Sequence, residues 1–180
     1  IFVDIRGQKV SDDTLNYVFD TINNETSVDV EVIFKNNLEV DFMSVGLMVC
    51  YNWWTVGEGS FFNSFFSTIY VKLENSNWGS KYPVIMNKLY WGDIPLEDIE
   101  SGIAELLSIQ EELKKFQPHD IIWDFEDLSA IPPWGNHIAS HIANLSQYFI
   151  TSSGSDLFEV MLTCFRFALE KGQNVVVKSI

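Results

Sequence analysis

The chain has 180 residues, of which 47% are hydrophobic, 14% aromatic and only 20% charged. This composition excludes a mostly disordered chain, and the length is sufficient to bury a core without metals or disulfides. Lys and Arg number 11 against 25 Asp and Glu, so the formal net charge is −14, which repels phosphate backbones. The totals therefore argue against direct nucleic-acid binding and favour a basic protein partner.

The cysteines and the apolar stretches give no sign of export or of a membrane. Cys50 and Cys164 both stand among apolar residues, so we expect buried, reduced thiols. The uncharged stretch 43–57 is interrupted by polar residues and is too short to span a bilayer. The first residues lack the basic start of a signal peptide, although a signal removed before residue 1 would leave no trace. We expect a soluble, cytoplasmic protein.

The first 44 residues are predicted to form a strand, a helix and a hairpin. Ser11 is a typical helix cap, and apolar residues recur at helical spacing as far as Ile22. Alternating apolar residues predict a strand at 28–34, and Asn36-Asn37 predicts a turn into a second strand at 38–43. We divide the chain into this N-terminal extension of the same fold, residues 1–44, and a main domain, residues 45–180.

The next predicted elements are a β-rich run at 45–56 and three helices. Six apolar residues at three- and four-residue spacing predict an amphipathic helix over 61–73, and a shorter helix follows over 84–89. The longest helix is predicted from Asp93 to about Phe116. Residues 93–127 hold eleven acids and two lysines. A solvated helix face is the ordinary explanation of such charge, but its continuation into the following loop favours a docking surface.

We regard residues 120–136 as the stretch around which the chain is organised. Bulky β-prone residues at 121–123 predict a short buried strand, followed by acids where that strand leaves the sheet. Pro132 and Pro133 remove two backbone donors and stiffen the segment that leads to Trp134. An exposed aromatic loop beside carboxylates suits binding, while the alternative is a surface turn whose Trp134 folds back onto the core.

The C-terminal third is predicted to alternate helices and strands. Ile138, Ile142 and Leu145 have helical spacing, residues 148–150 read as a short strand, and a helix is predicted over 156–171 before a last strand at 175–177. Helices and strands that interleave in this way indicate an α+β or α/β fold with a single mixed β-sheet layered with amphipathic helices.

One enzymatic alternative follows from the histidines. His137 and His141 are four residues apart and would share a helix face, with His119, Asp120 or Asp124 as a third ligand for a metal-dependent hydrolase. The pair lacks the glutamate of the metalloprotease motif, and neither a Gly-rich phosphate loop nor a serine elbow is present. We therefore expect no metal, no cofactor and no catalytic residues.

Several segments resemble a known family in order and spacing. They are Val45–Met48, Gly59–Thr68, Trp78–Pro83, Trp123–Leu128, Pro132–Asn136, Tyr148–Ser152, and Gly154 with Asp156–Val160. Over about residues 45–177 the chain resembles the immunity protein 70 family of bacterial polymorphic toxin systems. Residues 1–44 lie outside this resemblance, and the main domain, 45–180, is immunity-protein-like.

The resemblance implies a non-enzymatic antitoxin. It would bind the C-terminal toxin domain of a secreted polymorphic or contact-dependent toxin inside the producing cell. Many such toxin domains act on nucleic acids and are basic, which agrees with the net charge of −14. A subunit that self-associates through its aromatic loop is a further alternative. We expect the toxin to be bound by Glu97, Asp98, Glu105, Glu112, Asp124, Glu126, Asp127, Trp134 and Asn136.

Overall fold

The structure is a computed structural model, and it describes residues 44–135 and 137–179. The strand, helix and hairpin predicted for the first 43 residues lie outside the described residues, and so does Asn136. The division of the chain at residue 44 stays a prediction.

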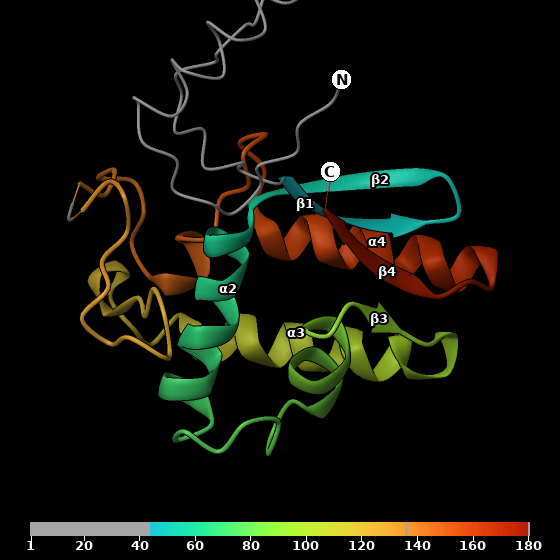
Figure 1. The fold of residues 1–180 in the computed structure, drawn as a ribbon, viewed down its shortest axis with the longest axis horizontal. Coiled ribbons are helices and arrows are strands. Elements are labelled where there is room, and N and C mark those ends of the chain that lie inside the picture. The colour runs from blue at the N-terminus through green and yellow to red at the C-terminus, as the bar shows by residue number, and fades with distance from the viewer. Residues whose placement is uncertain (1–43, 136, 180) are drawn as a thin grey trace, which may run out of the picture. The chain divides into compact units, whose positions relative to one another are not determined.

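Four strands form one antiparallel sheet (Figure 1). The strands β1 (Ser44–Val49) and β2 (Asn52–Glu58) make a hairpin, and β4 (Val175–Ser179) pairs with the other edge of β1. The short strand β3 (Asp93–Ile94) pairs with β4, which gives the order β2-β1-β4-β3. The predicted α+β class is confirmed, and every pairing among these four strands is antiparallel.

Gly46 is required where the hairpin strands approach each other most closely. The register between β1 and β2 shifts between Val45 and Gly46, which is the position of a bulge. A Cβ atom on Gly46 would lie 2.4 Å from the indole ring of Trp53 and 2.6 Å from the carbonyl oxygen of Trp54. Any larger residue would therefore displace β2 from β1.

The helices form layers behind the sheet. Helix α4 (Leu157–Lys171) packs against the sheet, and α3 (Ile99–Leu113) packs against α4 (Figure 1). Helix α2 (Gly59–Thr68) follows β2 directly and continues into a π-helical turn, η1 (Ile69–Leu73). A short helix, residues 83–89, contains a second π-helical turn, η2 (Ile85–Leu89). The helices predicted over 61–73, 84–89 and 156–171 are confirmed.

Local chemistry explains both ends of α4 and the late start of α3. The Asp156 carboxylate caps the first N–H groups of α4, and Gly172 ends this helix in the left-handed conformation. The prediction that the longest helix begins at Asp93 is wrong. Residues 93 and 94 are β3, because Ile94 precedes Pro95 and is held extended, and a 3-10 turn, η3 (Leu96–Asp98), leads into α3.

The core is built from the aromatic residues of α2 and from the helices around it. The fully buried ring of Phe65 makes edge-on contacts with Phe66, Phe149 and Phe158 at centroid separations of 5.3–5.6 Å. These contacts join α2, α4 and the segment before α4. The phenylalanine spacing read from the sequence thus marks core residues and not a cofactor site.

Two predicted elements of the C-terminal third are wrong. Residues 138–144 do not form a helix, and only a 3-10 turn, η5 (Leu145–Gln147), follows them. Residues 148–150 contribute a single β-bridge, between Ile150 and Asp156, in place of a strand. Apolar spacing alone misled the helix prediction, because the residues between the apolar ones include no strong helix-forming run. The strand prediction rested on three adjacent bulky residues, whose bulk instead places Tyr148 and Phe149 in the core.

A buried carboxylate organises the turn between η1 and the short helix. Glu74 is only 3% exposed. Its two oxygens accept hydrogen bonds from the backbone N–H groups of Gly79, Lys81 and Tyr82 at 2.7–2.9 Å. Charge-assisted bonds of this kind are strong, and they satisfy donors that would otherwise be unpaired.

We predict that Glu74→Ala lowers the free energy of unfolding by about 3 kcal/mol, because three N–H groups lose a charged acceptor. Chemical denaturation of both proteins measures the difference. The control is Glu111→Ala, which removes an exposed carboxylate paired with Lys114 and should change stability by less than about 0.5 kcal/mol. Equal effects of the two substitutions would contradict the role given to Glu74.

The two cysteines differ in exposure, so the expectation that both are buried is wrong for one of them. Cys50 is exposed at the tip of the β1-β2 hairpin, whereas Cys164 is buried in α4. Burial raises the pKa of the Cys164 thiol to about 12, so its reactive thiolate is scarce at neutral pH.

Labelling with a thiol-reactive disulfide reagent at pH 8 should therefore modify one cysteine in the native protein and two after unfolding. A Cys50→Ser variant should show no fast reaction in the native state. Rapid native labelling of that variant would contradict the burial of Cys164.

Candidate protein-binding surface

The acidic loop, residues 120–135, is held in place by side chains of α2. Thr68 Oγ1 accepts a hydrogen bond from the N–H of Ile122 at 3.2 Å, and Ser67 Oγ accepts one from the N–H of Phe125 at 3.1 Å. Both hydroxyls also donate within α2, to the carbonyl oxygens of Ser64 and Asn63. The strand predicted at 121–123 is wrong, because these hydroxyls take the place of a neighbouring strand.

An aromatic cluster fixes the middle of the acidic loop. The ring of Phe125 lies 5.6 Å from Tyr70 and 5.2 Å from Trp78, measured between centroids. Trp78 in turn contacts Tyr90 at 4.7 Å and donates a hydrogen bond to the carbonyl oxygen of Met86. Phe125 thus anchors the loop between η1 and the short helix, and its acidic neighbours on either side are carried by this anchor.

Three carboxylates of the loop remain available to a partner. Glu126 and Asp127 are exposed and Asp124 is partly exposed, and none of them forms an ion pair with another described residue. Asp124 accepts the N–H of Glu126 at 2.9 Å, while Asp127 accepts the hydroxyl and the N–H of Ser129. The hydrogen bond that the Ser129 hydroxyl donates is the main cause of a lowered pKa at Asp127, and the N–H of Ser129 lowers this pKa further. The Asp127 carboxylate is therefore ionised at neutral pH.

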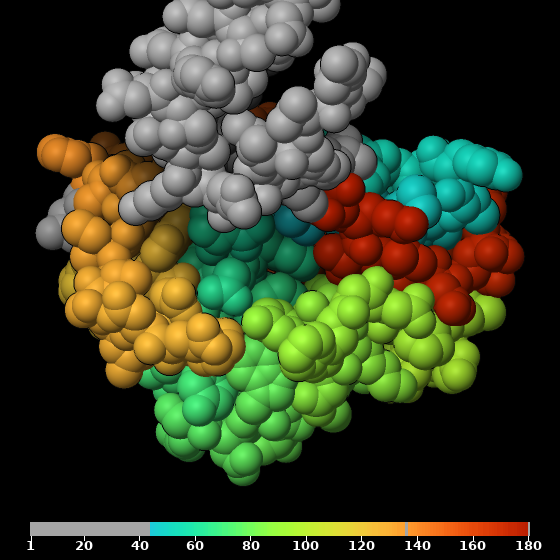
Figure 2. All heavy atoms as spheres, in the orientation of Figure 1, coloured from blue at the N-terminus to red at the C-terminus, as the bar shows by residue number. Residues whose placement is uncertain are grey.

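The loop acids lie beside the segment that follows the short helix. Figure 2 shows the loop, in orange, next to the lime-green segment around residues 90–95. Burial raises the pKa of Tyr90, and the charges of Glu126 and Asp124 raise it further, which agrees with this proximity. The neighbouring Trp91 is 76% exposed. The loop acids therefore border an aromatic surface.

The predicted acids of α3 and η3 are mostly engaged within the fold. Asp98 forms an ion pair with Lys88, and Glu112 pairs with Lys115 at 2.7 Å. Glu105 accepts the N–H groups of Val84 and Ile85 at 2.9–3.2 Å, and so caps the short helix. Burial raises the pKa of Glu105, and these two bonds oppose the shift. Of this set, only Glu97 is exposed and without an ion pair among the described residues.

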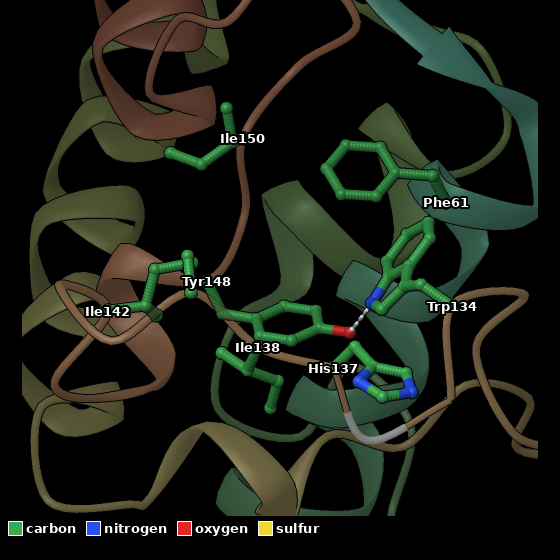
Figure 3. A pocket seen from close by; sticks show the side chains of 8 residues that line it. Phe61, Trp134, His137, Ile138, Ile142, Tyr148 and Ile150 are labelled. Atoms are coloured by element: carbon green, nitrogen blue, oxygen red, sulfur yellow. Dashed lines mark hydrogen bonds between the residues drawn. The ribbon is translucent and has the colours of Figure 1, made fainter.

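Trp134 agrees in part with both predictions made from the sequence, an exposed aromatic binding loop and a turn that folds back onto the core. Its indole Nε1 donates to the hydroxyl of Tyr148 at 3.0 Å (Figure 3). Its ring stands edge-on to Trp123 at a centroid separation of 5.3 Å. The side chain is nevertheless 41% exposed. Trp134 is thus held by the core and still presents a face to solvent, as an interface anchor would.

Trp134 forms one wall of an open apolar pocket with a volume of about 300 Å³ (Figure 3). The sequence did not indicate this pocket, because it arises where the predicted helix around residues 138–145 is absent. The signal in the sequence was limited to Ile138, Ala139 and Ile142 beside the two histidines. The pocket is lined by Phe61, Trp134, His137, Ile138, Ala139, Ile142, Tyr148 and Ile150.

The histidine arrangement proposed for a metal-dependent hydrolase is not supported. His137 and His141 do not share a helix face, because the segment between them is irregular. Among the described residues, no group of three or more His, Cys, Asp or Glu side chains is placed to hold a metal ion. Within the same ranges, no helix has both the length and the apolar character to cross a bilayer.

We predict that Thr68→Val loosens the acidic loop and lowers the free energy of unfolding by about 2 kcal/mol, since the N–H of Ile122 loses its acceptor. Hydrogen exchange should show faster exchange at residues 122–125. The control is Thr163→Val, an exposed threonine of α4, which should leave both quantities unchanged. Unchanged exchange in the Thr68 variant would contradict the anchoring described above.

Comparison with known proteins places these features in a family. The family model described as immunity protein 70 matches residues 47–177, a range that includes the acidic loop and the apolar pocket. Neither a curated protein nor a solved structure matches the chain. A family of immunity proteins implies a toxin protein as the partner. The match begins in β1, ends in β4 and covers most of the chain, so this chain belongs to the immunity protein 70 family.

Proposed function

We propose that this protein neutralises its cognate toxin domain, the C-terminal part of a secreted polymorphic or contact-dependent toxin, by covering it with the acidic loop. The observation that carries the proposal is the presence of three carboxylates that form no ion pair with another described residue, on a firmly anchored loop within the region that matches the family. The function requires binding alone, and it would operate in the cytoplasm of the producing cell.

Anchoring makes this loop suited to tight binding. The base of the loop is fixed by Ser67, Thr68 and the aromatic cluster around Phe125, while the Asp124 and Asp127 carboxylates close local turns. A surface that is already ordered loses little conformational entropy when a partner binds. Most of the interaction energy would therefore appear as affinity.

The charge around the loop determines which partner it suits. Between Lys115 and Arg166 the sequence contains no Lys or Arg, whereas it contains the three loop acids. Such a one-sided field accelerates association with a basic surface and disfavours acidic competitors. A toxin domain that acts on nucleic acid has a basic substrate groove, and the loop would occupy that groove in place of the phosphate backbone. We expect Glu97 and Trp134, which are both exposed, to contribute further contacts.

We predict that this chain, co-expressed with the toxin domain encoded next to it, relieves toxicity and co-purifies as a complex that high salt weakens. The triple variant Asp124→Asn, Glu126→Gln, Asp127→Asn should associate about tenfold more slowly at low salt, with a flatter salt dependence. The amide oxygens of the Asn residues can still accept the turn hydrogen bonds, so the loop keeps its shape. Stopped-flow association at several salt concentrations measures both effects.

The control is the triple variant Glu111→Gln, Glu159→Gln, Glu170→Gln, which removes the same net charge from exposed helix positions. It should associate nearly as fast as the wild type if the position of the loop acids matters. Equal slowing by both triple variants would show that only the total charge acts and would refute the assignment of the face. Absence of any complex, with toxicity unrelieved, would refute the proposed function itself.

A further inference from the structure

Several large apolar side chains are exposed in and just before the segment that lines the apolar pocket. Leu128 is 67% exposed, Ile131 71% and Ile150 38%, in addition to the partly exposed Trp134. All four lie between residues 128 and 150, and Trp134 and Ile150 also line the pocket. Exposed apolar side chains at a concavity, as Trp134 and Ile150 are here, are typical of a protein-binding site.

The walls of the pocket are already formed in the free protein. Tyr148 and Phe61 are 6% and 7% exposed, and the hydrogen bond between Tyr148 and Trp134 fixes one wall against the core (Figure 3). The ring of Trp123 packs edge-on against Trp134 at a centroid separation of 5.3 Å. The volume of about 300 Å³ corresponds to the space of about ten water molecules, which is enough for one large apolar side chain.

The surroundings of the pocket define the chemistry of its occupant. Trp123 contacts Trp134, a wall of the pocket, and directly precedes Asp124, so the sequence connects this wall to the exposed acids of the loop through a single ring contact. The whole stretch from residue 116 to 165 lacks Lys and Arg. A partner segment that satisfies both features has a large apolar side chain with basic residues beside it. The apolar centre with a charged rim is the arrangement of interface hot spots.

We infer that the apolar pocket receives a large apolar side chain of the toxin domain, flanked on the toxin by Lys or Arg residues that meet the acidic loop. This inference rests on the proposed function and adds an anchor to it. The acidic loop speeds the encounter, and the buried side chain slows dissociation.

The test is to fill the pocket from within. Ala139 lines the pocket but is itself exposed, so Ala139→Phe should occupy the cavity without disturbing the core. We expect Ala139→Phe to weaken binding of the toxin domain at least about 30-fold, mainly through faster dissociation. The matched control is Ala104→Phe, at an exposed alanine of α3 outside the pocket, and it should change affinity less than about twofold.

Affinities measured at low and high salt distinguish the contribution of the apolar pocket from that of the loop acids. The loss caused by Ala139→Phe should be the same at low and high salt, because apolar contacts are not screened, whereas the loss caused by neutralising the loop acids should shrink. Both phenylalanine variants should melt at the wild-type temperature. A photo-crosslinking residue at position 139 should capture a large apolar residue of the toxin domain.

The outcomes distinguish the two proposals. If the wild type binds the toxin domain and Ala139→Phe binds it equally well, the pocket inference is wrong and the proposed function stands. If the wild type forms no complex, both are wrong. If sedimentation shows that the wild type self-associates and Ala139→Phe does not, the pocket receives a second copy of this chain, and the inference is again overturned.

Discussion

The placement of the acidic loop depends on how the backbone polar groups of residues 122–125 are satisfied. These groups are partly buried and have no neighbouring strand, so they would be costly without other partners. The last turn of α2 provides those partners through Ser67 and Thr68. The helix therefore has two functions: its phenylalanines build the core, and the hydroxyls at its C-terminal end position the loop. The face that we assign to the toxin is fixed by the same element that fixes the fold.

The acidic residues that produce the net charge of −14 have distinct roles in the fold. Some are internal caps: Glu74, Glu105 and Asp156 accept backbone N–H groups and so shape turns and helix starts. Others, such as Asp98 and Glu112, are matched by nearby lysines. Glu126 belongs to neither group, and Asp124 and Asp127 close local turns but form no ion pair with another described residue. A count of acids along the sequence treats all of these as equal, whereas the structure leaves only part of the charge free to act on a partner.

These roles explain what could be predicted from the sequence and what could not. The helices over 61–73 and 156–171 were predictable, because their apolar spacing, the Asp156 cap and the terminal Gly172 all agree. The strand at 121–123 was wrong, since β propensity cannot reveal that helix hydroxyls will replace a strand. Glu105 was assigned to a binding face, because nothing in its neighbourhood indicates that it reaches backbone groups some twenty residues away. The apolar pocket escaped prediction because it depends on contacts between Phe61 and residues far along the chain.

The residues that anchor the acidic loop are different from the acids that it exposes. This difference affects how the sequence of such a protein can diverge. Phe125, Ser67 and Thr68 face inward and cannot change without cost to the fold, whereas Glu126 faces water and Asp124 and Asp127 make only local turn bonds that other small polar residues can also make. Substitutions at the exposed positions would alter recognition while leaving the scaffold intact. If the toxin binds at the face that we propose, lineages of this family would follow a changing toxin surface through a few loop positions, and each would lose protection against the toxins of its relatives without losing stability.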